Sequence, residues 1–349
     1  MILAERYHTE ETQYELINEI IRDDYFISNV GNICIEIGSS NLSDSLNGYL
    51  SMFNDNISNG EHKLLDFQRN ISFYPLWSRE SYRLFLVNLL TLNKSLGNQE
   101  KINLYLCDRE FEWSKIYTKE DWKKAINNDR DSIMSLNISF HYDKIRNSSR
   151  NKMLVILNEA HAIPNPEWID KWQKRAAQYL SEKYGNQKIA SVLINSVKSN
   201  KDDVDILLQE GYWDAAFNIS EKNNIGFDFI NSPFGRDKFD YAIGKNNDLF
   251  CYKDIFKGFV FYKPIEQHRL SEGVNGIIDD DFREEFLRRM KICYGNRYYK
   301  RLRKDTDLMG WNNIEYYHYD KFDKMVRRIN KIKEKYIETK TKAYNSQYR

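Results

Sequence analysis

The stretch ILAERYH (residues 2–8) holds the pattern that decides the fold, a short apolar run followed at once by charged and polar residues. The pattern recurs in NICIEIGSS (32–40), INLYLCDR (102–109) and MLVILNEAH (153–161). Apolar runs of this length are typical of buried strands, and most segments between them carry helical patterns. Because strands alternate with helices, the sequence predicts an α/β fold of three layers. A mostly parallel central sheet carries helices on both faces, and a helical appendage follows at the C-terminal end.

Strands and helices can be assigned along most of the chain. We expect strands at 1–8, 31–37, 101–107, 152–157 and 187–194, with less regular candidates near 225–230 and 258–263. Residues 60–76 are less regular, residues 118–147 are expected to be helical, and only helices are expected after about residue 279. Five Pro and fifteen Gly leave little room for long flexible linkers. We expect an α/β domain over residues 1–275 and a helical extension over residues 276–349.

Composition limits the classes of function. The 349 residues carry a net charge of +1, which points to neither a nucleic-acid binder nor an acidic-surface protein. The basic and aromatic run at 297–304 fits a solvated helix face, with a nucleic-acid surface as the alternative. No apolar run approaches the roughly 18–20 residues that cross a membrane. Four cysteines without a C-x-x-C pair suit a reducing compartment. We expect a cytoplasmic protein that binds a small-molecule substrate and binds neither nucleic acid nor a membrane. The sequence does not indicate the oligomeric state.

Acidic and histidine residues fall near the downstream ends of the first four strands. They are Glu5, His8, Glu36, Asp108 and His161. In a parallel sheet the downstream strand ends share one edge, and ligands bind in the crevice outside it. Such side chains are costly beside buried strands unless they are paired or functional. We therefore expect one polar site there.

The residue types suit acid–base chemistry. Glu36 lies between buried neighbours, and its carboxylate needs a partner that His8 on a neighbouring strand could supply. A His–carboxylate pair fixes the imidazole tautomer and raises its basicity, as a general base requires. Arg130, which precedes Asp131, could clamp a carboxylate or a substrate oxygen. The alternatives are structural: surface ion pairs, a surface imidazole, and a carboxylate that caps the turn at Ser39.

Taken in order, these pieces resemble the erythromycin esterase-like family, within a wider group that includes ChaN-type haem-binding lipoproteins and TraB/Tiki-like proteins. Four features of the family have counterparts in this sequence. They are G-E-x-x-H-G at residues 4–9, a strand ending in Glu at 35–40, R-[DE]-x-x-M-x-x-N-[IV] at 130–138 and H-N-x-H at 158–161. The resemblance covers about residues 1–195. Ala4 and Thr9 replace the two glycines of the first motif, and Asn158 replaces the first His of the last one.

The resemblance implies a hydrolase that cleaves an ester or lactone bond without a bound metal. His8 corresponds to the general base of the family. Glu5, Glu36, Arg130 and His161 correspond to the polar shell around that base.

Three further residues are expected to bind at the same edge, namely Asp108, Ser39 and Asp131. We expect no cofactor, and no tightly bound transition metal, because Arg130 would repel a cation. Two alternatives stay open. One is metal-assisted hydrolysis of the Tiki/TraB type, with a divalent ion held by histidines and carboxylates. The other is a non-catalytic protein that binds a small ligand such as haem.

Overall fold

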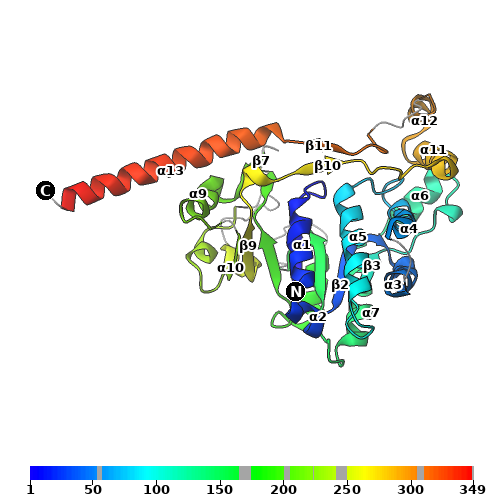
Figure 1. Ribbon diagram of the computed structural model, residues 1–349, viewed down its shortest axis with the longest axis horizontal. Helices are drawn as coiled ribbons and strands as arrows, with labels where there is room; N and C mark the ends of the chain where they lie inside the picture. The colour runs from blue at the N-terminus through cyan, green and yellow to red at the C-terminus, as the bar shows by residue number, and fades with distance from the viewer. Residues whose placement is uncertain are drawn as a thin grey trace.

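A seven-stranded sheet forms the centre of the protein (Figure 1). The computed structural model describes residues 1–52, 57–164, 174–199, 205–222, 224–240, 250–304 and 310–347. The strand order is β3-β2-β4-β1-β5-β9-β8. The strands are β1 (Ile2–Glu5), β2 (Asn32–Ser39), β3 (Asn103–Asp108), β4 (Leu154–Asn158), β5 (Ser191–Ile194), β8 (Asn224–Asp228) and β9 (Gly258–Tyr262). Neighbouring strands pair in parallel, except that β8 runs antiparallel to β9. The predicted mostly parallel α/β sheet is confirmed.

Both faces of the sheet are covered by helices. The helices that contribute to the core on one face are α1 (Thr12–Arg22), α2 (Asp24–Asn29), α3 (Ser43–Met52), α4 (Ile57–Arg69) and α5 (Glu80–Ser95). Those on the opposite face are α7 (Arg130–Ile145), α8 (Ala176–Tyr184), α9 (Tyr212–Ile219) and α10 (Tyr252–Ile255). Successive strand side chains point to opposite faces, so Leu3 joins the first core while Ile2 and Ala4 join the second. This is why the strands are continuous apolar runs.

Residues 118–147 are helical, as expected, but two helices with a break between them occupy that region. Helix α6 (Lys119–Ile126) is capped by Asn127, and α7 begins at Arg130. The side chain of Asp129 accepts a hydrogen bond from the backbone N–H of Ser132 and so caps α7. Asn and Asp side chains compete with helical hydrogen bonds and favour such caps. The break makes Arg130 and Asp131 the first two residues of α7.

Two expectations need correction. Residues 60–69, expected to be irregular, belong to α4, whose Leu64 and Phe67 are buried. The region after residue 279 also contains a strand, β11 (Glu315–Tyr317), which pairs antiparallel with β10 (Leu270–Glu272). Three residues are too few to reveal a strand period, so only the pairing with β10 identifies β11. A second small pair joins β6 (Val197–Ser199) to β7 (Asp205–Leu207).

The C-terminal part is mainly helical, as expected. It contains α11 (Asp280–Tyr294), α12 (Asn296–Leu302) and α13 (Asp320–Gln347). The first turns of α13 pack through Phe322, Met325 and Ile329, and the helix then projects away from the body (Figure 1). The boundary at residue 275 stays a prediction. Among the helices that the structure describes, none combines the length and apolar character needed to cross a membrane.

Arg6 ties the loop after β1 to the ends of two other strands. Its guanidinium is buried and donates to the backbone carbonyl and side-chain oxygen of Asn195, at 2.5 Å each, and to the carbonyl of Tyr262 at 2.6 Å. The same group donates to Glu10 at 2.9 Å and to Thr12 at 3.0 Å. These five bonds use the five N–H groups of an arginine. The loop that leads from Glu5 to His8 is therefore held against β5 and β9.

We expect Arg6→Ala to lower the free energy of unfolding by about 3–5 kcal/mol, because the buried Glu10 carboxylate would lose its cationic partner. Arg22→Ala is the control: Arg22 is exposed on α1, and its loss should change stability by no more than about 0.5 kcal/mol. Urea unfolding measures both. Equal losses in the two variants would contradict the anchoring role of Arg6.

Candidate active site

Polar side chains from three strands, two loops and one helix meet at the carboxyl edge of the sheet. Glu5 ends β1, Glu36 lies in β2 and Asp108 ends β3. His8 and His161 lie in the loops that follow β1 and β4. Because β3, β2, β4 and β1 are successive neighbours in the sheet, their ends adjoin. Arg130 and Asp131 reach the same place from the start of α7.

Glu36 is the centre of this cluster. Its Oε1 accepts a hydrogen bond from Nη1 of Arg130 at 2.8 Å, and its Oε2 accepts one from the backbone N–H of Asn158 at 2.7 Å. Nε2 of His161 lies 3.7 Å from Oε1, and Nε2 of His8 lies 4.0 Å from it. Burial alone would raise the pKa of Glu36, but the positive charges of His161, Arg130 and His8 outweigh burial and hold that pKa well below its usual range.

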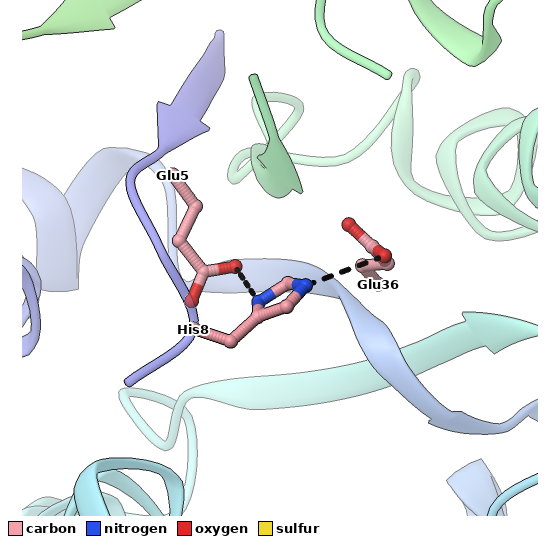
Figure 2. Close-up of side chains that lie close together, drawn as sticks. All are labelled: Glu5, His8 and Glu36. Atoms are coloured by element: carbon pink, nitrogen blue, oxygen red, sulfur yellow. Dashed lines mark ion pairs between the residues drawn. The ribbon is translucent and has the colours of Figure 1, made fainter. Parts of the chain in front are cut away.

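His8 lies between two carboxylates, as Figure 2 shows. Its Nδ1 is 3.2 Å from Oε2 of Glu5, while Nε2 faces Glu36. Oε1 of Glu5 accepts a hydrogen bond from the Tyr14 hydroxyl at 2.7 Å, and the imidazole contacts the Trp77 ring edge-on, with centroids 5.0 Å apart. The side chain of His8 remains 25% exposed. Burial opposes its positive charge, yet Glu5 and Glu36 prevail and raise the pKa of His8.

His161 forms a second imidazole–carboxylate pair. Its Nδ1 lies 2.7 Å from Oδ1 of Asp131, which also accepts a hydrogen bond from the backbone N–H of Ala176 at 2.8 Å. Nε2 of His161 therefore faces the cluster, 3.4 Å from Nη1 of Arg130. The sequence indicated Asp131 as a binding residue but not its pairing with His161.

Arg130 links the two carboxylates at the ends of β2 and β3. Its Nε donates to Oδ1 of Asp108 at 3.1 Å, and the Ser72 hydroxyl donates to Oδ2 of Asp108 at 2.9 Å. The guanidinium lies over the Phe73 ring, 4.5 Å from its centroid. Burial opposes the charge of Arg130, but Glu36 and Asp108 outweigh burial and raise its pKa.

Ser39 is next to the cluster without joining its contacts. It lies opposite Asp108 in the β2–β3 register, and its hydroxyl donates to the Asn70 carbonyl at 2.9 Å. Sequence reasoning missed Tyr14 and Trp77. Tyr14 belongs to the apolar stripe of α1 and resembles a core residue, and Trp77 follows an irregular stretch, so neither carried a signal.

The loop that carries His8 is held by distant parts of the chain. The backbone N–H of Ser271 in β10 donates to the Thr9 carbonyl at 2.9 Å. The Ser81 hydroxyl in α5 donates to the His8 carbonyl at 3.3 Å. The imidazole is therefore positioned by β10 and α5 as well as by β1.

Proton transfer and stabilisation of negative charge are the chemistry that this cluster can supply. Two imidazoles and a guanidinium lie around one carboxylate, with His8, His161 and Arg130 each partly exposed. Glu5, His8 and Glu36 also place ligand atoms within 4.8 Å of one another, which a divalent ion could bridge. However, Arg130 already puts a positive charge 2.8 Å from Glu36, so a cation fits this donor set poorly.

Comparisons with known proteins find no match in sequence to a family profile or to a curated protein. Among solved structures, a Bacillus cereus protein is 11% identical over 75% of this chain and 88% of its own, with a TM-score of 0.43. A succinoglycan biosynthesis protein is 11% identical over 75% and 87%, with a TM-score of 0.47. The erythromycin esterase EreC, as a variant in its open conformation, is 10% identical over 74% and 89%, with a TM-score of 0.45. Membership of the esterase-like family stays a prediction.

The lowered pKa of Glu36 predicts how acid affects stability. A carboxylate whose pKa is lowered by folding stabilises the protein above its unfolded pKa, about 4.3, and loses that effect as the pH falls further. We expect Glu36→Gln to cost about 1–3 kcal/mol at pH 7, because Gln keeps acceptor oxygen but loses the charge. The cost should shrink steadily below about pH 4. Urea unfolding across pH measures this, with Glu284→Gln on an exposed face of α11 as the control. A cost that stays constant down to acid pH would contradict the assignment.

Proposed function

We propose that the protein is a hydrolase in which His8 activates water against an ester or lactone bond. The observation that carries this proposal is the contact of 3.2 Å between Nδ1 of His8 and Oε2 of Glu5, on an imidazole that remains 25% exposed. Glu5 favours the tautomer with a proton on Nδ1 and leaves Nε2 as the proton acceptor. The raised pKa of His8 makes that nitrogen a stronger base than a free imidazole.

The other side chains suit the remaining steps. As His8 takes a proton, the water oxygen attacks the carbonyl carbon, and Arg130 and His161 stabilise the negative oxygen that forms. The ester C–O bond then breaks, and the protonated His8 returns the proton to the leaving alcohol. A preorganised donor of this kind contributes about 10²–10³ in rate. Glu36 and Asp131 hold Arg130 and His161 in place.

We expect His8→Ala to abolish any hydrolysis found in a screen of aryl esters and lactones, while His62→Ala keeps it. His62 is a matched control, since its side chain is 66% exposed and pairs with Asp279 on the surface. If hydrolysis persists unchanged in His8→Ala, the base is misassigned. If no substrate turns over while a small ligand still raises the melting temperature, a non-catalytic binding protein becomes the better proposal.

The pH profile provides a separate test of the base. His8 must be neutral to accept a proton, so kcat/KM should rise with pH through a pKa above the ordinary value of about 6.5. Glu5→Gln keeps the volume of the side chain but removes the charge that raises this pKa. The acidic limb should therefore move to lower pH in Glu5→Gln. If the acidic limb does not move in Glu5→Gln, Glu5 does not set the pKa of the catalytic base.

Metal-assisted hydrolysis is a second candidate function, favoured by the close approach of Glu5, His8 and Glu36. In that case these residues would hold a divalent ion, which would supply a Lewis acid or an activated water. The Arg130 guanidinium beside Glu36 opposes this candidate.

Elemental analysis of protein purified without chelator separates the two candidates. We expect zinc and manganese far below one ion per chain, because Arg130 occupies the side of Glu36 that faces both histidines. One tightly bound ion per chain, lost on substitution of Glu5, would replace the first candidate with the second.

A further inference from the structure

Arg109, the residue that follows β3, is a buried cation with unused donors. Only 5% of its surface is exposed. Its Nε and Nη1 are shielded from solvent and have no hydrogen-bond partner among the residues that the structure describes. Buried guanidinium groups normally have their N–H groups satisfied, as Arg6 does with five bonds. Two unsatisfied donors therefore need an explanation.

The carboxylate beside Arg109 is shared. Nε of Arg109 lies 3.6 Å from Oδ1 of Asp108, and Nε of Arg130 donates to that same oxygen at 3.1 Å. The second oxygen of Asp108 accepts a hydrogen bond from Ser72. Burial lowers the pKa of Arg109, and the attraction of Asp108 does not offset burial and the repulsion from Arg130. The charge of Arg109 is thus incompletely compensated.

Arg130, which shares the Asp108 oxygen with Arg109, adds a third unused donor. Its Nη2 is buried and lacks a hydrogen-bond partner within the described part of the chain, although its Nη1 and Nε are both engaged. Arg130 is also the first residue of α7, whose N-terminal end carries a partial positive charge. Two guanidinium groups therefore share one oxygen of Asp108 beside a helix N-terminus, and three of their N–H-bearing nitrogens have no acceptor among the described residues.

We propose that the free N–H groups of Arg109 and Arg130 bind an oxyanion, the carboxylate or phosphate group of an anionic substrate. Guanidinium groups match the paired oxygens of such groups. This inference rests on the proposed hydrolase and deepens it. Because Nη1 of Arg130 lies 3.4 Å from Nε2 of His161, an anion on Nη2 would anchor the substrate beside the catalytic cluster.

A structural role for Arg109 predicts the opposite response to substitution. If Arg109 stabilised the fold, its removal would lower the melting temperature. If it is an incompletely compensated buried charge kept for a ligand, an apolar side chain of similar length should raise the melting temperature of the free protein. Arg109→Met makes this distinction, and Arg297→Met, at an exposed position on α12, is the control for loss of one positive charge.

The experiment follows melting temperature in titrations with inorganic phosphate and with acetate, at ionic strength held constant with chloride. We expect the melting temperature of the wild type to rise saturably with at least one of the two anions. The anion that raises it distinguishes a phosphate site from a carboxylate site. Arg109→Met should melt higher than the wild type without anion and should bind that anion at least about tenfold more weakly. Arg297→Met should respond as the wild type does.

Two outcomes would overturn the inference: a wild type that responds to neither anion, or an Arg109→Met that melts lower and keeps the full response. The readout is binding, so it is independent of turnover. His8→Ala should retain the anion response even if the proposed hydrolysis fails. Conversely, a protein that hydrolyses neutral esters but binds neither anion would keep the proposed function and lose this inference.

Discussion

The burial of one negative charge, that of Glu36, is the constraint on which the arrangement of the site depends. A carboxylate in a central strand pays a large desolvation cost unless it is fully paired. The structure meets this cost with a hydrogen bond from Arg130, one from the backbone of Asn158, and two imidazoles within 4.0 Å. Helix α7, strand β4 and the loop after β1 must therefore converge on β2.

Around that charge, the same chemical pair is built twice from unrelated elements. Glu5 and His8 come from one strand and its loop, whereas Asp131 and His161 come from a helix and a loop after another strand. In each pair a carboxylate faces Nδ1, and both Nε2 atoms face Oε1 of Glu36. Because the carboxylate fixes the orientation of each ring, both imidazoles present a defined nitrogen without relying on the substrate.

The position of the site also depends on regions far from it in sequence. Arg6 fastens the loop after β1 to the ends of β5 and β9, and β10 holds the next residues through the Thr9 carbonyl. Since β10 pairs with β11, the C-terminal part contributes to the placement of His8. The loop that carries the proposed base is thus held by contacts with the ends of β5 and β9 and with β10, which favours a preorganised site over one that forms on binding.

The sequence by itself determined the sheet and the edge at which the polar residues gather. Apolar runs buried on both faces can only be central strands, and parallel strands bring their downstream ends together. It did not determine which carboxylate holds which histidine, because that depends on the strand order and on the break at residues 127–129 that sets the start of α7.

The unpaired donors of Arg109 also could not be predicted from the sequence. An unpaired donor is recognised only from the atoms around it, and those atoms come from segments that only the folded chain brings together.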